Sequence, residues 1–267
     1  MKQVRRWLPG QRLVLVVDGS FAAVSLALAC VKHQVVMVSR LRWDAALYHW
    51  PEPQPAGKRG PKPTKGKRHR SLQGWAERSD TPWETVEVDW YGGQRKKLWV
   101  FSRTALWYTP RVPPVAIRFA MVCDPAGKLR MEACFCTDLE ATPVAILHWV
   151  VMRWSVEVTF EEARAHLGLE TQRQWADQAI ARTTPVLLAL FSLVILLALQ
   201  VSQGGQIPVP VTAWYHKDEP TFSDCLALVR RHLRRARYLV NSTPGAECVQ
   251  FPQAALELLI QGASLAA

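Results

Sequence analysis

The feature that most constrains the fold is a strand–helix–strand pattern near the N-terminus. Residues 12–18 form a continuous apolar run, RLVLVVD, that ends in Asp18. Small and apolar residues compatible with a helix occupy 19–33, and a second apolar run, QVVMVSRLR, follows at 34–42. Runs that are apolar throughout are typical of strands buried on both faces, and two such strands joined through a helix predict a parallel βαβ unit. The expected class is therefore α/β, with Asp18 at the carboxyl end of a strand, where open α/β sheets carry functional groups.

The composition changes abruptly after this unit. Residues 51–70 contain five Pro, three Gly and seven Lys or Arg, with one acid, Glu52. Such a stretch cannot build a core, so we expect residues 49–83 to form a flexible basic loop. Sequence-blind contacts with DNA phosphates and simple solvation explain its charge equally well. The candidate DNA-binding cations of this loop are Lys58, Arg59, Lys62, Lys65, Lys67, Arg68 and Arg70.

The next segment, residues 84–140, has the alternation of β-strands around two turn signals. Gly92 and Gly93 separate one pair of alternating runs, and DPAGK at 124–128 separates another. These patterns predict two hairpins. We expect them to form a small antiparallel subdomain inserted after the βαβ unit.

Helical patterns return after residue 141. Two helices are expected, with a break near residues 148–153, followed by the apolar stretch 186–201. This stretch is shorter than the roughly 20 residues needed to span a membrane, so a fully buried core helix, with Pro185 in its first turn, is the favoured interpretation. A linker at 203–220 and an Arg-rich amphipathic helix at 222–240 complete the prediction.

Charge and cysteine content limit the classes of partner and compartment. The formal net charge is +11, which favours a polyanionic partner such as nucleic acid. The six cysteines form no Cys-x-x-Cys pair, so no zinc site is indicated and reduced thiols are expected. The histidines do not cluster at metal-ligand spacings. The sequence also lacks a Gly-rich phosphate loop, the motif that would indicate a nucleotide-binding site.

The segment RWSVEVTFEEARAHLGLE, residues 153–170, predicts a helix with one charged face. Four residues, Arg153, Glu157, Glu161 and Arg164, share that face because residues three, four and seven apart lie together on a helix. On pattern alone, a solvated ladder of Glu and Arg is the ordinary explanation. The opposite face, expected to pack on the core, carries Val156, Phe160, Ala163 and Leu167.

Taken together, LVLVVDGSFA, VVMVSRLRWDAALY, a long β-rich insertion and this helix resemble the DDE transposases of bacterial insertion sequences. One group of that family carries the signature Tyr, two residues, Arg, three residues, Glu, six residues, Lys. Arg153 and Glu157 match it at the right spacing, and Arg164 occupies the Lys position. Val150 stands in the Tyr position, which is a departure, with Trp149 adjacent. The resemblance covers roughly residues 10–200.

The resemblance implies a fold and a division of the chain. The fold is α/β, with a partial RNase H-like core, an inserted antiparallel β subdomain and C-terminal helices. The implied segments are 1–48 (second half of the core), 49–83 (basic loop), 84–140 (β-rich insertion), 141–202 (catalytic-Glu helix and buried helix) and 203–267 (linker and basic amphipathic helices).

The resemblance also implies a site. Asp18 would be the second catalytic Asp and Glu157 the catalytic Glu, and both would hold Mg²⁺ or Mn²⁺. Arg153 and Arg164, with Trp154 beside them, would contact the cleaved end of double-stranded DNA. A homodimer on the DNA is left open. No membrane and no nucleotide are expected, and the bacterial cytoplasm is the expected location.

One element of that site is missing from the sequence. The family's first catalytic Asp lies upstream of the second, and residues 1–17 contain no Asp or Glu. We therefore expect an N-terminally truncated core with an unpaired strand edge. Asp44, Asp124 and Asp138 are interpreted as loop or turn residues that do not replace the missing ligand.

Three functional hypotheses follow. The first is a transposase that cleaves and transfers DNA strands, completed by an upstream reading frame. The second is a DNA-binding remnant without catalysis. The third is a membrane-associated basic protein built on residues 186–201 and the Arg-rich helix.

Overall fold

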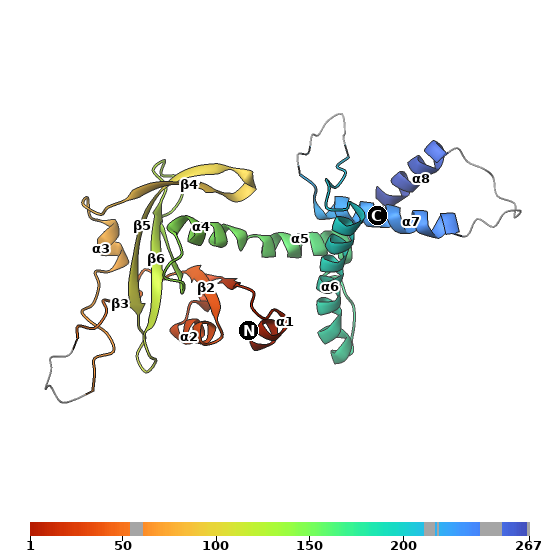
Figure 1. Ribbon diagram of the computed structural model, residues 1–267. Helices are drawn as coiled ribbons and strands as arrows, with labels where there is room; N and C mark the ends of the chain where they lie inside the picture. The colour runs from red at the N-terminus through yellow and green to blue at the C-terminus, as the bar shows by residue number, and fades with distance from the viewer. Residues whose placement is uncertain (54–60, 211–216, 218, 241–252, 266–267) are drawn as a thin grey trace, which may run out of the picture. The chain divides into compact units, whose positions relative to one another are not determined.

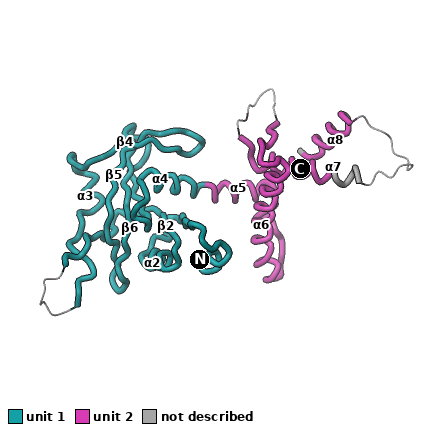
Figure 2. The backbone as a smooth tube through the Cα atoms, in the orientation of Figure 1, with its two compact units in different colours: residues 1–154 teal, residues 155–267 magenta. Residues whose placement is uncertain are grey.

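The computed structural model describes residues 1–53, 61–210, 217, 219–240 and 253–265 (Figure 1). The chain divides into two compact units, Met1–Trp154 and Ser155–Ala267 (Figure 2). The first unit is a mixed α/β structure built on one sheet, and the second is helical.

The predicted βαβ unit is confirmed. After the short helix α1 (Lys2–Trp7), strand β1 (Leu13–Val17), helix α2 (Val24–Lys32) and strand β2 (Val35–Arg40) follow in order, and β1 runs parallel to β2. The prediction that β1 is buried on both faces is wrong, because all five of its residues are only partly buried. β1 lies at the end of the sheet and pairs with β2 alone among the described strands. The expected strand edge is therefore present.

Five further strands extend the sheet in an antiparallel arrangement. Their order is β1-β2-β7-β6-β5-β3, and β4 also pairs with β5. Both predicted hairpins are confirmed: positive φ angles at Gly92, Gly93 and Gly127 form the turns, a conformation that glycine adopts without steric cost. The strands are β3 (Leu47–Tyr48), β4 (Glu84–Asp89), β5 (Arg95–Trp107), β6 (Val115–Cys123) and β7 (Glu132–Cys136).

The inserted strands do not form a separate subdomain, and that expectation is corrected. β7 pairs antiparallel with β2, with Val38 opposite Cys136, so the insertion continues the sheet of the βαβ unit. Pairing of this kind was not readable from either hairpin alone, since it joins residues almost a hundred positions apart.

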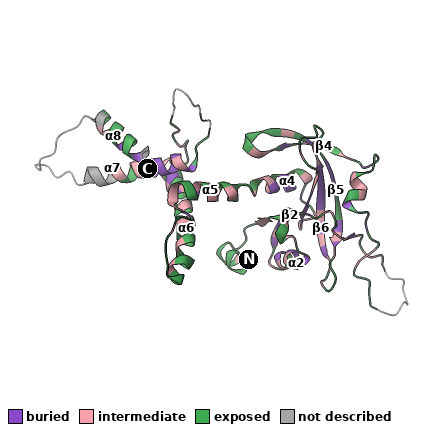
Figure 3. Cartoon of the chain, turned by 180° about the vertical axis from the view of Figure 1, so that it is seen from behind, coloured by how far each residue is buried: buried purple, intermediate pink, exposed green. Residues whose placement is uncertain are grey.

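Helices cover both faces of the sheet, as Figure 1 shows for α2 and α4. On one face, Met37, Phe119 and Phe135 pack with α2 and with Leu72 of α3 (Leu72–Ala76). On the other, α4 (Pro143–Met152) packs through Ile146 and Val150 onto β2 and β7. Buried residues concentrate in these strands and in α2 (Figure 3). Each large apolar side chain buried in this way contributes about 1.5–3 kcal/mol.

The predicted break between two helices near residues 148–153 is also confirmed. α4 ends at Met152 and α5 (Ser155–Leu167) begins three residues later. Thr142 caps α4, since its Oγ1 accepts a hydrogen bond from the Ala145 N–H at 3.2 Å, and Pro143 occupies the first turn.

The basic loop is more ordered at its base than predicted. The His49 N–H donates to the Lys67 carbonyl at 2.9 Å, the Gly66 N–H donates to the His49 carbonyl at 2.8 Å, and the His69 N–H donates to the Leu47 carbonyl at 2.8 Å. A Cβ at Gly66 would lie 2.3 Å from the Trp50 carbonyl oxygen, so only glycine fits. The description of 49–83 as one flexible loop is therefore wrong for its second half. Lys58 and Arg59 lie outside the described residues.

The second unit consists of α5, α6 (Asp177–Val201), α7 (Phe222–Val240) and α8 (Gln253–Leu265). The rings of Phe191 and Phe222 stack with centroids 4.2 Å apart. Ala163 is fully buried, as predicted for the inner face of α5, but Val156 is 51% exposed, so that face is narrower than expected. The buried cluster of this unit comprises Val194, Ala198, Phe222, Cys225, Leu226 and Val229.

The prediction of a fully buried helix at 186–201 is wrong. α6 begins at Asp177, so Pro185 lies inside it rather than in its first turn, and Val194 and Ala198 are its buried residues. By length and composition it is the one helix of the described residues that could cross a membrane, a test that a soluble protein's core helix also passes. Its exposed large apolar residues include Val186, Leu190, Leu193, Leu196 and Leu199.

The stacked pair His49 and His69 predicts that the stability of the first unit depends on pH. Their ring centroids are 3.6 Å apart, and burial, with the charges of His49 and Arg103, lowers the pKa of His69 from 6.5 to about 4. Because the unfolded chain takes up this proton first, stability should be complete above about pH 6.5 and fall as the pH drops toward about 4. The loss should be on the order of 1–3 kcal/mol.

Urea unfolding followed by far-ultraviolet circular dichroism at pH 7 and pH 5 measures this effect. His69→Asn should reduce the difference between the two midpoints. His148→Asn, at an exposed position, is the matched control and should retain it. An unchanged pH dependence in His69→Asn would contradict the prediction.

Candidate functional site

Asp18 lies at the carboxyl end of β1, as predicted. Its Oδ1 accepts a hydrogen bond from the Ser20 N–H at 3.0 Å, and its main-chain carbonyl accepts one from the Ser39 Oγ at 3.0 Å. This geometry caps the short 3-10 helix η1 (Gly19–Phe21) and fixes the direction of the side chain. The Ser20 hydrogen bond, aided by the positive charges of Arg153 and Arg40, lowers the pKa of Asp18. The exposed carboxyl is therefore ionised at neutral pH.

One of the two cations near Asp18, Arg40, comes from the neighbouring strand β2. Arg40 ends β2, and its Nε lies 3.2 Å from a carboxylate oxygen of Glu132, the first residue of β7. Both side chains are partly exposed, so this ion pair contributes to positioning more than to stability. Glu132 was not predicted, because the pairing of β2 with β7 is what brings it to this edge.

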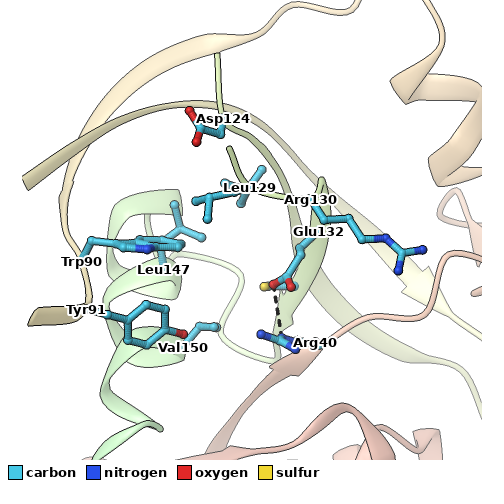
Figure 4. Close-up of a pocket in the computed structure, with 11 residues that line it drawn as sticks. Arg40, Trp90, Tyr91, Asp124, Leu129, Arg130, Glu132, Leu147 and Val150 are labelled. Atoms are coloured by element: carbon cyan, nitrogen blue, oxygen red, sulfur yellow. Dashed lines mark ion pairs between the residues drawn. The ribbon is translucent and has the colours of Figure 1, made fainter. Parts of the chain in front are cut away.

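A cavity of about 190 Å³ opens beside this ion pair (Figure 4). Trp90 and Tyr91, from the turn between β4 and β5, stand across it from Arg40 and Glu132. Burial raises the pKa of Tyr91, so its hydroxyl stays protonated. Aromatic and aliphatic walls with a few polar groups at one side suit a flat ligand that has a polar edge. The aliphatic lining includes Val122, Leu129, Leu147 and Val150.

Tyr91 is a second residue that linear spacing did not find. Val150, which stands in the Tyr position of the transposase signature, is buried in the lining of the cavity that Tyr91 also lines. Tyr91 arrives there from the short helix η2 (Tyr91–Gly93), and its ring meets that of Trp154 edge-on with centroids 5.8 Å apart. An aromatic ring therefore occupies this region from a different part of the chain.

The two predicted metal ligands belong to different units. Asp18 is part of the first, and Glu157 lies in the first turn of α5 in the second. Their pairing therefore stays a prediction. Within the described residues, no group of three or more His, Cys, Asp or Glu side chains is placed to hold a metal ion.

The predicted DNA contacts divide into groups. Arg153 lies near Asp18, and Trp154 is 52% exposed. Arg164 makes a two-pronged ion pair with Glu170, at 2.6 and 2.8 Å, so its guanidinium is already held by the LGLE segment. A phosphate group that binds Arg164 would therefore have to compete with Glu170 for the guanidinium.

The basic loop likewise contains cations that contact aromatic rings of the fold and cations that are exposed. Lys65 lies over the rings of Tyr48 and Tyr108, with Nζ 3.9 and 3.4 Å from their centroids, and so holds the base of the loop. Arg70 lies 5.6 Å from the centroid of Trp75. The exposed cations of the described part of the loop are Lys62, Lys67, Arg68, Arg70 and Arg78.

Comparison with known proteins does not identify a family, since no family model and no curated protein matches the chain.

The alkylation rates of the cysteine thiols provide a test of how β7 packs against α4. Cys134 is 1% exposed, and burial raises its pKa to about 12, while burial raises that of Cys136 to about 11. Since the thiolate is the reactive form, both should resist alkylation by iodoacetamide at pH 8, whereas the partly exposed Cys123 should react roughly a hundredfold faster. Mass spectrometry of the labelled peptides measures the rates. Equal rates in the native protein would contradict the packing of β7 against α4, and equal rates in urea are the control.

Proposed function

We propose that this chain carries part of the catalytic machinery of a DDE-type DNA transposase with an RNase H-like core, which cleaves and transfers DNA strands with Mg²⁺. The observation that carries the proposal is Asp18, an exposed and ionised carboxylate at the end of a parallel strand, with Arg40 and Arg153 near it. A carboxylate flanked by arginines is suited to a phosphodiester substrate, because the carboxylate can bind a metal ion and the guanidinium groups can bind phosphate oxygens.

The order of elements supports the same proposal. A parallel βαβ unit is followed by antiparallel strands and then by the helix that carries Glu157. The net charge of +11 favours a polyanionic substrate. The aromatic cavity beside Arg40 suits a nucleobase, a flat group with a polar edge, and Trp90 and Tyr91 are the residues that would contact it.

Each residue then has a role in the proposed reaction. Asp18 and Glu157 would hold the Mg²⁺ through hard oxygen ligands, to which this ion binds well. When bound, the ion supplies charge stabilisation at the phosphate and a more acidic water. Arg40 and Arg153 would orient the phosphate, and the Ser20 hydrogen bond would keep the Asp18 carboxylate ionised and correctly turned.

Nicking of supercoiled plasmid, with and without Mg²⁺, by the chain completed with an upstream segment that supplies the first catalytic Asp tests the proposal. Asp18→Asn and Glu157→Gln should each abolish Mg²⁺-dependent nicking, with losses of at least about a hundredfold. Asp44→Asn is the matched control, because Asp44 is exposed and paired with Arg42 in a loop, and it should leave nicking unchanged.

The outcomes separate the alternatives. DNA binding without nicking, unchanged in Asp18→Asn, would favour a non-catalytic DNA-binding remnant. Failure of the chain to bind DNA at all would reject both the transposase and the DNA-binding remnant. Nicking that survives in both carboxylate variants would reject the assigned residues.

A second candidate function is association with a membrane. It is favoured by the exposed leucines of α6. Fractionation of a lysate tests it. If the chain associates with membranes, it should sediment with them and resist extraction by high salt, and Leu193→Gln with Leu196→Gln should release it. Recovery of the unmodified chain in the supernatant would reject this candidate.

A further inference from the structure

A second site is suggested by a break in the strand pairing along the edge of β5. β4 pairs with Arg95–Val100, and β3 pairs with Leu106–Trp107, so residues 101–105 lie between the two partner strands. A groove of about 580 Å³ opens at this place. We call it the β5 groove and define it by Arg103, Arg118, His49, His69 and Ser102, which all line it.

Two arginines of the groove are held in place by contacts of their own. The Nε of Arg118 donates to the Leu139 carbonyl at 2.7 Å, which orients the guanidinium. Arg103 lies over the rings of Trp75 and Phe101, 5.2 and 5.4 Å from their centroids. An arginine held in this way loses less side-chain entropy on binding an anion.

Groups without a formal charge also line the groove. The Oγ of Ser102 is buried and has no hydrogen-bond partner within the described residues, although burial of an unpartnered hydroxyl is costly. Pro143 also lines the groove, in the first turn of α4, whose positive dipole end favours an anion nearby. His69 is largely buried and adds an imidazole beside His49.

The opposing charges are few and exposed. Glu84, at the start of β4, lines the groove and disfavours an anion there, but its one negative charge is opposed by the two positive charges of Arg103 and Arg118. An adjoining hollow of about 410 Å³ shares His49 and His69 and contains Lys67 and Glu52, whose charges are opposite. The fixed arginines thus leave the β5 groove net positive.

We propose that the β5 groove binds a phosphate group, either of a nucleic-acid backbone or of a free phosphate compound. Phosphate accepts hydrogen bonds at several oxygens at once, which matches guanidinium, imidazole and hydroxyl donors converging from β5, β6 and the loop base. β2, β7 and β6 separate β1 from β5, so the groove lies roughly 19 Å from the strand that carries Asp18. It is therefore distinct from the edge assigned to cleavage.

The proposal does not depend on catalysis, so its test uses binding alone. Binding of a fluorescent DNA duplex by the full chain is measured by anisotropy at several salt concentrations, and binding of pyrophosphate is measured by calorimetry. Arg118→Gln should weaken about tenfold the binding of whichever probe occupies the groove, the DNA duplex or pyrophosphate. If that ligand is DNA, it should also lower the salt slope by about one. Glu84→Gln should strengthen binding, since it removes the opposing charge.

Two further variants keep the test interpretable. Ser102→Ala removes the unpartnered hydroxyl without disturbing a contact of the fold, and it should weaken binding severalfold. Lys128→Gln makes the same charge change as Arg118→Gln in the turn between β6 and β7, outside the groove, and should have a much smaller effect.

The results distinguish the sources of the phosphate. Pyrophosphate binding that is lost in Arg118→Gln and competes with DNA indicates a free phosphate compound. DNA binding that depends on Arg118, with no competition by millimolar pyrophosphate, indicates a phosphodiester backbone. Equal effects of Arg118→Gln and Lys128→Gln, with no effect of Ser102→Ala, would overturn the proposal. Asp18→Asn should leave this binding intact even if the proposed nuclease activity fails.

Discussion

The antiparallel pairing of β2 with β7 is the contact on which the rest of the first unit depends. It joins a local βαβ unit to strands contributed by a distant part of the chain, so that one sheet with two covered faces results. Without it, each part would expose an unpaired strand edge to water, and α4 could not pack on β2 and β7 together. Because this pairing joins residues far apart in sequence, it costs much chain entropy to form and is expected to form late in folding.

The same pairing explains the composition of the edge near Asp18. Asp18 and Arg40 end parallel strands, and Glu132 begins the antiparallel strand beside them. Three polar groups from three strands therefore meet where two hydrophobic layers end. Burial beside this edge raises the pKa of Tyr91 and keeps it protonated, while the Ser20 hydrogen bond and nearby cations lower the pKa of Asp18 and keep it ionised, so groups of different character coexist within one small region.

Local patterns in the sequence were sufficient for much of the fold. The βαβ unit, both hairpins, the break between α4 and α5 and the position of Asp18 followed from periodicity and turn residues, which act over a few positions. Features set by tertiary context did not. Hydrophobicity alone placed residues 186–201 in a core, although half of these residues are exposed and Val194 and Ala198 are the buried ones, and it placed β1 inside the sheet rather than at its end. Tyr91 and Glu132 escaped detection because only the folded sheet brings them to Arg40.

Gly66 gives the basic loop a property that composition does not predict. Its close approach to the Trp50 carbonyl fixes the two ends of the loop side by side, so the entropy of closing the loop is already lost in the folded protein. Lys65 and Lys67, on either side of Gly66, are therefore held beside His49 and Trp50. A polyanion that docks there meets a high local concentration of positive charge without the chain having to gather it.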